Sequence, residues 1–419
     1  DLIGDQVHTR RMRGLRFLFR SLLGLPLVAT VASFEPVPCL LVISPPELKP
    51  AWRDYSQKRS RAGCSVSVID TESIAIGYKG RDLQEKIRLC VRSQIDEQNV
   101  QWVILGGDST PEGGLIPDRD TLHRNMWGED KDIPTDIYYI SATDWDADDD
   151  GIYGEFEDDR EEISYPDGSV AIGRVPVRTA EDVKAYTNKM LRFLKKVEGD
   201  SESGSLTLTC AVPGAYSKVS RSGKELIPAE WPKGSIEFLF TDYSSWDGET
   251  PGDYDLSPEH LIDQMNEGKV DKWHLHGHGL VDRWQLEKRE DFTVDSVKKL
   301  TNLDHLPVIT TVSCFTGHFD AEKDPCISEA MLRHPAGGAI AIVAPAREGK
   351  PHFHDPKKDF PLMVEEGKLD GTTQTMTSFW IAALGDGKTT GEALAAAKAG
   401  LVRDAEKSAT YHQGICEIN

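Results

Sequence analysis

The chain of 419 residues is long enough for two or three domains of ordinary size, or for one large α/β body. Hydrophobic residues make up 39% of it and charged residues 28%, so a core can form and wholesale disorder is disfavoured. Lysine and arginine number 48 against 69 aspartate and glutamate, a net charge of −21. This charge disfavours sequence-independent nucleic-acid binding and adhesion to anionic membranes. No apolar run reaches the roughly 20 residues of a membrane span.

Residues 1–35 differ from the rest of the chain. Residues 12–20 are basic and apolar, and an apolar run over 21–31 ends at the small residue Ala32. The pattern over 12–32 is typical of a secretory signal peptide and favours an exported protein. An amphipathic helix from a pro-segment or a preceding domain explains the same pattern equally well.

The first half of the chain alternates strands with helices. Short apolar runs bounded by Gly, Pro or Asp predict strands at 39–43, 64–69, 102–105 and 170–174. Helix-forming and charged residues predict a helix at 47–61, and amphipathic spacing predicts one at 81–98. A third helix is predicted at 179–196, with Thr179 as its N-cap.

The pattern restarts after a polar linker at 198–204. Strands are predicted at 206–212, 236–240, 272–278, 308–313 and 339–344, and helices at 258–267, 328–333 and 390–407. We therefore expect two α/β units, 36–198 and 204–419, each with a mostly parallel sheet covered by helices on both faces.

Seven cysteines without any C-x-x-C pair indicate neither a disulfide scaffold nor a structural zinc site. Nothing in the sequence predicts an organic cofactor.

An acidic segment points to a cation. Residues 129–162 hold 15 acidic and two basic residues, a net charge of −13. Within it, the run from Asp146 has the spacing of a calcium loop: side-chain oxygens at Asp146, Asp148 and Asp150, a backbone carbonyl at Ile152 and a final carboxylate at Glu157. The sequence on either side of this run does not predict the paired helices of an EF-hand. We expect a structural Ca²⁺; the alternative is an acidic loop without an ion.

Two predicted strand ends in the second unit carry reactive side chains. One strand runs into His278 between two glycines, and another runs into Cys314. A cysteine nucleophile needs an imidazole nearby, and carboxyl ends of parallel strands share one edge of a sheet. A buried core cysteine is the alternative reading of Cys314.

These motifs carry a family resemblance. The sequences Ala171–Arg178 (AIGRVPVR), Gly277–Gly279 (GHG), Ser313–Asp320 (SCFTGHFD) and Pro325–Ala330 (PCISEA) resemble, in this order, segments of the gingipain-type cysteine peptidases, family C25 of the caspase-like clan. The resemblance covers about 39–416. It implies two caspase-like, Rossmann-like subdomains of three α/β/α layers. It also implies an endopeptidase that works through a Cys–His dyad and a thioester acyl-enzyme.

The resemblance assigns roles to individual residues. Cys314 would be the nucleophile, His278 would protonate the leaving amine, and the N–H groups of Gly279 and Cys314 would form the oxyanion hole. Trp284 would line the substrate cleft, although a core position is an equally ordinary place for it.

The resemblance also implies a basic P1 residue, but the family's acidic pocket residue has no match within 216–225. Glu225, Asp282 or Asp108 could substitute for it. Proteolytic maturation of a zymogen, with 1–35 as a pro-region, is a further implication.

Two other functions remain open from the sequence. A caspase-like scaffold with an inert Cys314 would bind protein partners, and the unmatched pocket favours it. A metallohydrolase would use His274, His276 and His278, which share one face if they lie on one strand.

Overall fold

The computed structural model describes residues 40–61, 63–110, 114–124, 130–161, 163–165, 167–199, 206–210, 236–240, 254–286, 290–322, 325–349, 371–380, 382–383, 388–405, 416 and 418. Residues 37–419 form one compact unit. The predicted N-terminal signal or pro-segment, the linker at 198–204, Glu225 and the segment 216–225 fall largely or wholly outside the described residues.

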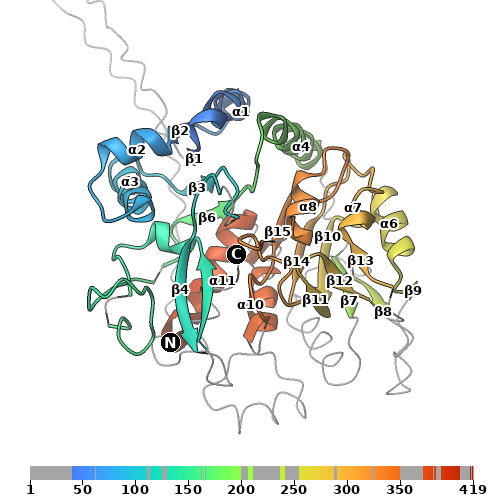
Figure 1. The fold of residues 1–419 in the computed structure, drawn as a ribbon. Helices are drawn as coiled ribbons and strands as arrows, with labels where there is room; N and C mark the ends of the chain where they lie inside the picture. Colours follow the sequence, from blue (N-terminus) through green and yellow to red (C-terminus); the bar gives the residue numbers. More distant parts are fainter. Residues whose placement is uncertain are drawn as a thin grey trace, which may run out of the picture. The chain divides into compact units, whose positions relative to one another are not determined.

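The first sheet is parallel and has four strands in the order β2-β1-β3-β6 (Figure 1). They are β1 (Leu40–Ser44), β2 (Val66–Asp70), β3 (Trp102–Leu105) and β6 (Ala171–Arg174). All five residues of β1 are buried, as expected of an apolar strand that is central in a sheet covered on both faces.

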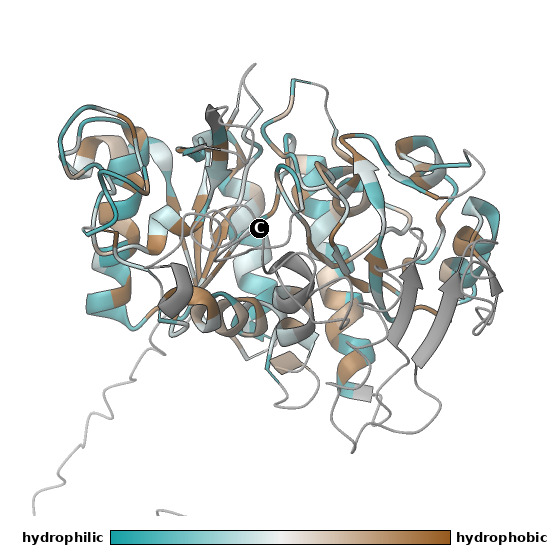
Figure 2. Ribbon diagram, turned by 90° about the horizontal axis from the view of Figure 1, so that it is seen from below, coloured by the Kyte–Doolittle hydropathy of each residue, from teal (hydrophilic) through white to brown (hydrophobic). Residues whose placement is uncertain are grey.

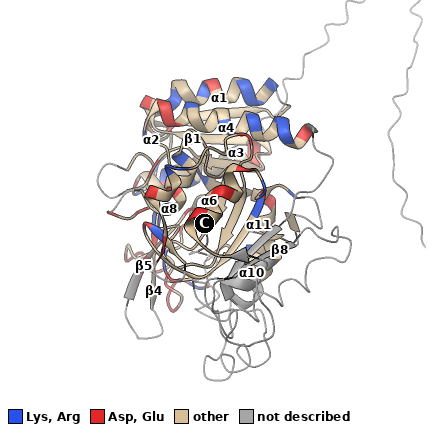
Figure 3. Cartoon of the chain, turned by 90° about the vertical axis from the view of Figure 1, so that its right-hand side faces the viewer, with Lys and Arg blue, Asp and Glu red and all other residues tan. Residues whose placement is uncertain are grey.

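Helices cover this sheet. They are α1 (Lys49–Arg61), α2 (Thr71–Gly77), α3 (Leu83–Gln98) and α4 (Ala180–Gly199), with the 3-10 turns η1 (Pro46–Leu48) and η2 (Ile137–Ile140). The N-cap Asp82 starts α3 by accepting a hydrogen bond from the Glu85 N–H at 2.8 Å. Asn99 ends it in the left-handed region at φ 53°. Helices α1 and α4 lie side by side and carry charged residues on their surface (Figure 3).

The second sheet is also parallel and has the strand order β15-β14-β10-β7-β8-β9. Its strands are β7 (Leu206–Cys210), β8 (Ile236–Phe240), β9 (Tyr254–Asp255), β10 (Lys272–His276), β14 (Val308–Thr311) and β15 (Ala341–Val343). The helices in this part of the sequence are α6 (Pro258–Asn266), α7 (Val294–Val297), α8 (Ile327–Arg333), α10 (Gly371–Trp380) and α11 (Thr390–Ala405). The two sheets fall on either side of the predicted boundary at 198–204.

Two small antiparallel sheets complete the described β-structure. One consists of β11 (His278–Leu280), β12 (Arg283–Gln285) and β13 (Phe292–Thr293), and the other is the hairpin of β4 (Arg119–Arg124) and β5 (Asp130–Thr135). Neither was predicted, since β4 and β5 are polar and β11 to β13 are only two or three residues long.

The two halves share a hydrophobic core. A cluster around Trp52 of α1 and Val183 of α4 continues to Val308 of β14 and to Phe379 of α10. Helix α11 packs on the first sheet, where a Cβ at Gly391 would lie 2.9 Å from Ala171 of β6. Figure 2 shows hydrophobic residues along the strands and on one side of the helices. The sheets are therefore separate, but the packing that stabilises them is continuous. No described helix has the length and apolar character required to span a membrane.

Candidate active site

Strands β10 and β14 are neighbours and bring two sequence motifs to one edge of the second sheet. They pair in parallel from Lys272 opposite Val308 to Leu275 opposite Thr311. The Val312 N–H continues the ladder to the Leu275 carbonyl at 3.1 Å. His278 and Cys314 follow soon after the ends of β10 and β14. The predicted placement of both segments at the carboxyl edge of one parallel sheet is thereby confirmed.

Gly279 packs directly against the turn that carries Cys314. A Cβ at position 279 would lie 2.8 Å from the Cys314 carbonyl oxygen and 2.5 Å from the Thr316 Cγ2 atom. No real Cβ has such contacts, so only glycine fits here. The backbone next to His278 thus lies in van der Waals contact with the backbone at Cys314.

Hydrogen bonds define the turn around Cys314. The Ser313 N–H donates to the Thr311 hydroxyl at 3.0 Å, and the Thr316 hydroxyl donates to the Ser313 carbonyl at 2.7 Å. Phe315 adopts φ 60°, the left-handed region that disfavours a non-glycine residue. Cys314 itself is half-buried and His278 is exposed, so a substrate can approach both.

The three histidines of the β10 segment do not lie on one strand. β10 ends at His276, and His278 opens the separate strand β11. His274 and His276 are buried, and burial lowers the pKa of His274 to about 4 and that of His276 to about 3. His274 Nδ1 lies 2.8 Å from the Thr310 hydroxyl, which also accepts a bond from the Trp380 indole at 2.8 Å.

No histidine takes part in the metal-ligand clusters of the described residues, which are formed by carboxylates. These positions do not support the three-histidine metal site.

Trp284 lies in the core rather than at a surface. It is fully buried, and its ring centroid lies 5.2 Å from that of Trp273 and 5.5 Å from that of Phe292. The expectation that it lines a substrate cleft is therefore corrected: a tryptophan on β12 alternates inward, toward the apolar cluster.

The predicted acidic pocket residues are engaged elsewhere or lie outside the described part of the chain. The Asp282 carboxylate accepts from Arg283 at 2.8 Å. Asp108 is buried and pairs with Arg178 at 2.5 Å and with Arg333 at 3.1 Å. Neither is an unneutralised acceptor for a basic substrate side chain, and Glu225 is not among the described residues.

The acidic loop brings together a set of carboxylates that differs from the predicted one. Oxygens of Asp146, Asp148 and Asp159 lie within 4.8 Å of one another. Asp150 and Glu157 do not belong to this group; Asp150 instead accepts a hydrogen bond from the Ile152 N–H at 2.7 Å. Asp159 takes the place expected for Glu157.

Asp159 replaces Glu157 in the group because the end of the loop folds back on its own backbone, in a way that differs from an EF-hand loop. Asp159 accepts from the N–H groups of Ala147 and Glu155, at 2.6 and 3.0 Å. The Asp146 carboxylate accepts from the Asp150 N–H at 3.0 Å, and Gly151 turns the chain at φ 86°.

One arginine balances this loop. Arg81 pairs with Asp144 at 2.8 Å, with Asp149 at 3.0 Å and also with Asp146. Burial raises the pKa of Glu155 and that of Asp159, and neighbouring carboxylates raise both further.

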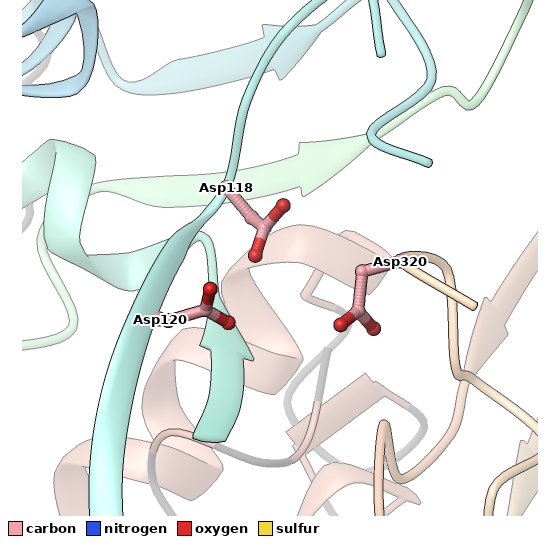
Figure 4. Close-up of side chains that lie close together, drawn as sticks. All are labelled: Asp118, Asp120 and Asp320. Carbon is pink, nitrogen blue, oxygen red and sulfur yellow. The ribbon is translucent and has the colours of Figure 1, made fainter. Parts of the chain in front are cut away.

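A second group of carboxylates includes the last residue of the Cys314 loop, which is the segment Ser313–Asp320. Figure 4 shows Asp118, Asp120 and Asp320 turned toward a common space, and their oxygens lie within 4.8 Å of one another. Asp118 and Asp120 lie at the start of β4, whereas Asp320 ends the motif that begins at Ser313. The sequence does not predict this group, because Asp320 is distant in the chain from Asp118 and Asp120 and the three residues do not have the spacing of a known ligand motif.

Comparison with known proteins defines the family. The model of peptidase family C25 matches residues 35–416, nearly the whole chain. The chain belongs to peptidase family C25. It is therefore a cysteine-type peptidase, and its substrates are polypeptides. No curated protein matches it.

Solved structures share the fold of this C25 peptidase. The Arg-specific cysteine proteinase gingipain R (RgpB) is 18% identical with a TM-score of 0.60, over 92% of this chain and 77% of that one. The complex of the pro- and mature domains of RgpB from Porphyromonas gingivalis is 17% identical with a TM-score of 0.57, over 90% and 77%. A structure described as a protease is 16% identical with a TM-score of 0.60, over 92% and 77%. These likenesses support the gingipain-type, caspase-like α/β fold.

Proposed function

We propose that this C25 peptidase is an endopeptidase with a Cys314–His278 dyad. The close approach of Gly279 to the Cys314 turn carries the proposal, because it fixes the two motifs at one edge of the sheet. His278 is the exposed histidine of its segment, whereas His274 and His276 are buried.

The reaction proceeds by acyl transfer. The Cys314 thiolate attacks the scissile carbonyl carbon, and the N–H groups of Gly279 and Cys314 stabilise the oxyanion. The C–N bond then breaks, the amine takes a proton from His278, and a thioester remains on Cys314. His278 next removes a proton from water, the hydroxide attacks the thioester, and the C–S bond breaks to release the acid.

A basic P1 residue remains our proposal for specificity. Its support is the net charge of −21 and the Arg specificity in the description of gingipain R. With Asp282 and Asp108 paired to arginines, Glu225 is the candidate acidic residue. A cleavage profile on a peptide library tests it, and a profile without basic P1 residues contradicts it.

A Ca²⁺ ion would stabilise the acidic loop. Two oxygens bound to one Ca²⁺ ion at 2.3–2.6 Å are separated by at most about 5 Å, and oxygens of Asp146, Asp148 and Asp159 lie close enough together to meet this requirement. Asp146, Asp148 and Asp159 would hold the ion, which supplies the positive charge that several adjacent carboxylates require.

Maturation from a zymogen is the last part of the proposal. The RgpB complex of pro- and mature domains supports it by analogy. N-terminal sequencing of the wild type and of Cys314→Ala after identical incubation tests self-processing. Identical N-termini contradict it.

Labelling with an acyloxymethyl ketone probe tests the dyad. We expect mass spectrometry to map the adduct to Cys314, and Cys314→Ala to abolish it. Absence of labelling in the folded wild type would favour the non-catalytic scaffold.

A further inference from the structure

Arg347 contacts the Cys314 loop at both of its ends. The residue follows β15, and its carbonyl accepts a hydrogen bond from the Phe315 N–H at 2.6 Å. Its guanidinium donates to both oxygens of Asp320, at 2.8 and 2.7 Å. A single side chain and its own backbone therefore fix the first and last parts of the loop that carries the proposed nucleophile.

The contact at Phe315 stabilises an unfavourable backbone conformation. A non-glycine residue in the left-handed region costs about 1–2 kcal/mol, and Phe315 has φ 60°. The Gly317 N–H donates to the Pro345 carbonyl at 2.9 Å, so the same segment binds the turn twice. The orientation of the Cys314 N–H and side chain depends on this turn, because Cys314 immediately precedes it.

The contact at Asp320 is well placed to resist movement. The Arg347 side chain is 12% exposed and that of Asp320 is 15% exposed. A bidentate guanidinium–carboxylate pair is directional, and partial burial strengthens it. The Arg347 Nε–H also donates to the Asp132 carbonyl at 2.9 Å, which connects the loop to strand β5 of the hairpin.

Charge makes the arginine necessary at this place. Asp118 and Asp120 approach Asp320 to within 4.8 Å, and three carboxylates this close repel one another. Burial opposes the charged form of Arg347, yet Asp320, Asp120 and Asp118 together raise its pKa. Without the guanidinium, Asp320 would move away from the hairpin and the loop behind it would shift.

We propose that Arg347 is a positioning residue that sets the reactive geometry of Cys314 by holding both ends of its loop. This role rests on the proposed function of Cys314 as the nucleophile. Nothing in it requires Arg347 to touch a substrate, and its effect is on the rate of attack rather than on substrate binding.

The experiment compares Arg347→Ala, Arg347→Lys and Asp320→Asn with the wild type. The rate of covalent labelling by an acyloxymethyl ketone is measured at saturation and per titrated active site, together with the inhibitor concentration at half-saturation. We expect Arg347→Ala to lower the saturating rate by on the order of 10²-fold, as a misplaced reacting group does, and to leave the half-saturating concentration unchanged.

The other variants separate the bidentate geometry of the guanidinium from its charge. Arg347→Lys keeps the positive charge but loses the bidentate contact with Asp320, so a smaller loss of labelling rate is expected. Asp320→Asn should lower the labelling rate about as much as Arg347→Lys. The double variant Arg347→Ala/Asp320→Asn should react hardly more slowly than Arg347→Ala alone. The matched control is Arg192→Ala. It removes a half-exposed arginine of α4 that pairs with Asp304.

An unchanged labelling rate per titrated site in Arg347→Ala would overturn the proposal, even if its melting temperature falls. If Arg347→Ala does not fold, unchanged rates in both Arg347→Lys and Asp320→Asn overturn it. A folded wild type that never labels overturns the proposed function and the positioning role together. Labelling of the wild type with unaffected variants overturns the positioning role alone.

Discussion

Gly279 lies so close to Cys314 that a Cβ at position 279 would come within 2.8 Å of the Cys314 carbonyl oxygen. The contact joins two motifs that neighbouring parallel strands deliver to one edge of the sheet. Glycine at this point therefore does more than free the backbone: its missing side chain lets the segment after His278 pack on the nucleophile turn.

Substitution of Gly279 by Ala should displace His278 from the Cys314 turn. We expect a loss of peptide cleavage on the order of 10²-fold per titrated site, because a shift of about 1 Å in reacting groups has this effect. Gly77→Ala is the control, since a Cβ there meets no atom within 4 Å. Equal activities of the two variants would contradict the packing argument.

Calcium should stabilise the fold through Asp159 and not through Glu157. Ca²⁺ binding to the native state adds about 2.7 kcal/mol to the free energy of unfolding when the Ca²⁺ concentration is about a hundred times Kd. The melting temperature should therefore be higher in Ca²⁺ than in a chelator. Asp159→Asn should reduce this shift, whereas Glu157→Gln should keep it, because Asp159 lies in the converging group. A shift lost in Glu157→Gln and retained in Asp159→Asn would restore the ligand set expected from the sequence.

Glu329 should make the fold less stable as pH rises. Burial, with Asp108 nearby, raises the pKa of Glu329 from 4.5 to about 8, so the native state keeps a proton that the unfolded chain has lost between these values. The free energy of unfolding then falls with pH, by at most about 1.4 kcal/mol per pH unit.

Glu329→Gln imitates the protonated carboxyl and should flatten this part of the pH profile. Buried histidines such as His274 contribute the opposite slope at acidic pH, since burial lowers their pKa. The difference between variant and wild type in denaturant titrations from pH 5 to about 8 isolates Glu329. Parallel profiles would show that Glu329 is ionised in the native state.

Trp284 should act on stability and not on substrate binding. Truncation of a buried Trp to Ala costs about 3–5 kcal/mol, and Trp284→Phe, which retains an aromatic contact with Trp273, should cost less. Steady-state kinetics of Trp284→Phe should give an unchanged KM with a lower Tm. A raised KM at an unchanged Tm would instead show that Trp284 lines the substrate cleft.

Apolar strands were the most predictable part of the fold. The runs at 102–105 and 236–240 gave strands with the expected bounds, since a strand buried on both faces reads as a continuous apolar stretch. The hairpin of β4 and β5 could not be predicted, because its polar sequence lacks alternation and its position depends on contacts with distant segments.

The site was predictable where it depends on strand ends and unpredictable where it depends on packing. His278 and Cys314 follow neighbouring strands, and topology alone brings such positions together. The replacement of Glu157 by Asp159 depends on how the loop folds back on its own N–H groups. The contact of Arg347 with Phe315 and Asp320 joins distant segments and has no local sequence signal.

Peptide cleavage by the wild type, Cys314→Ala and His278→Ala, measured side by side on folded protein, tests the central claim most directly. We predict that Cys314→Ala has no turnover, and that His278→Ala loses most of the wild-type rate, both with unchanged melting temperatures. Cleavage by Cys314→Ala at the wild-type rate would contradict the assignment of the nucleophile and, with it, the dyad.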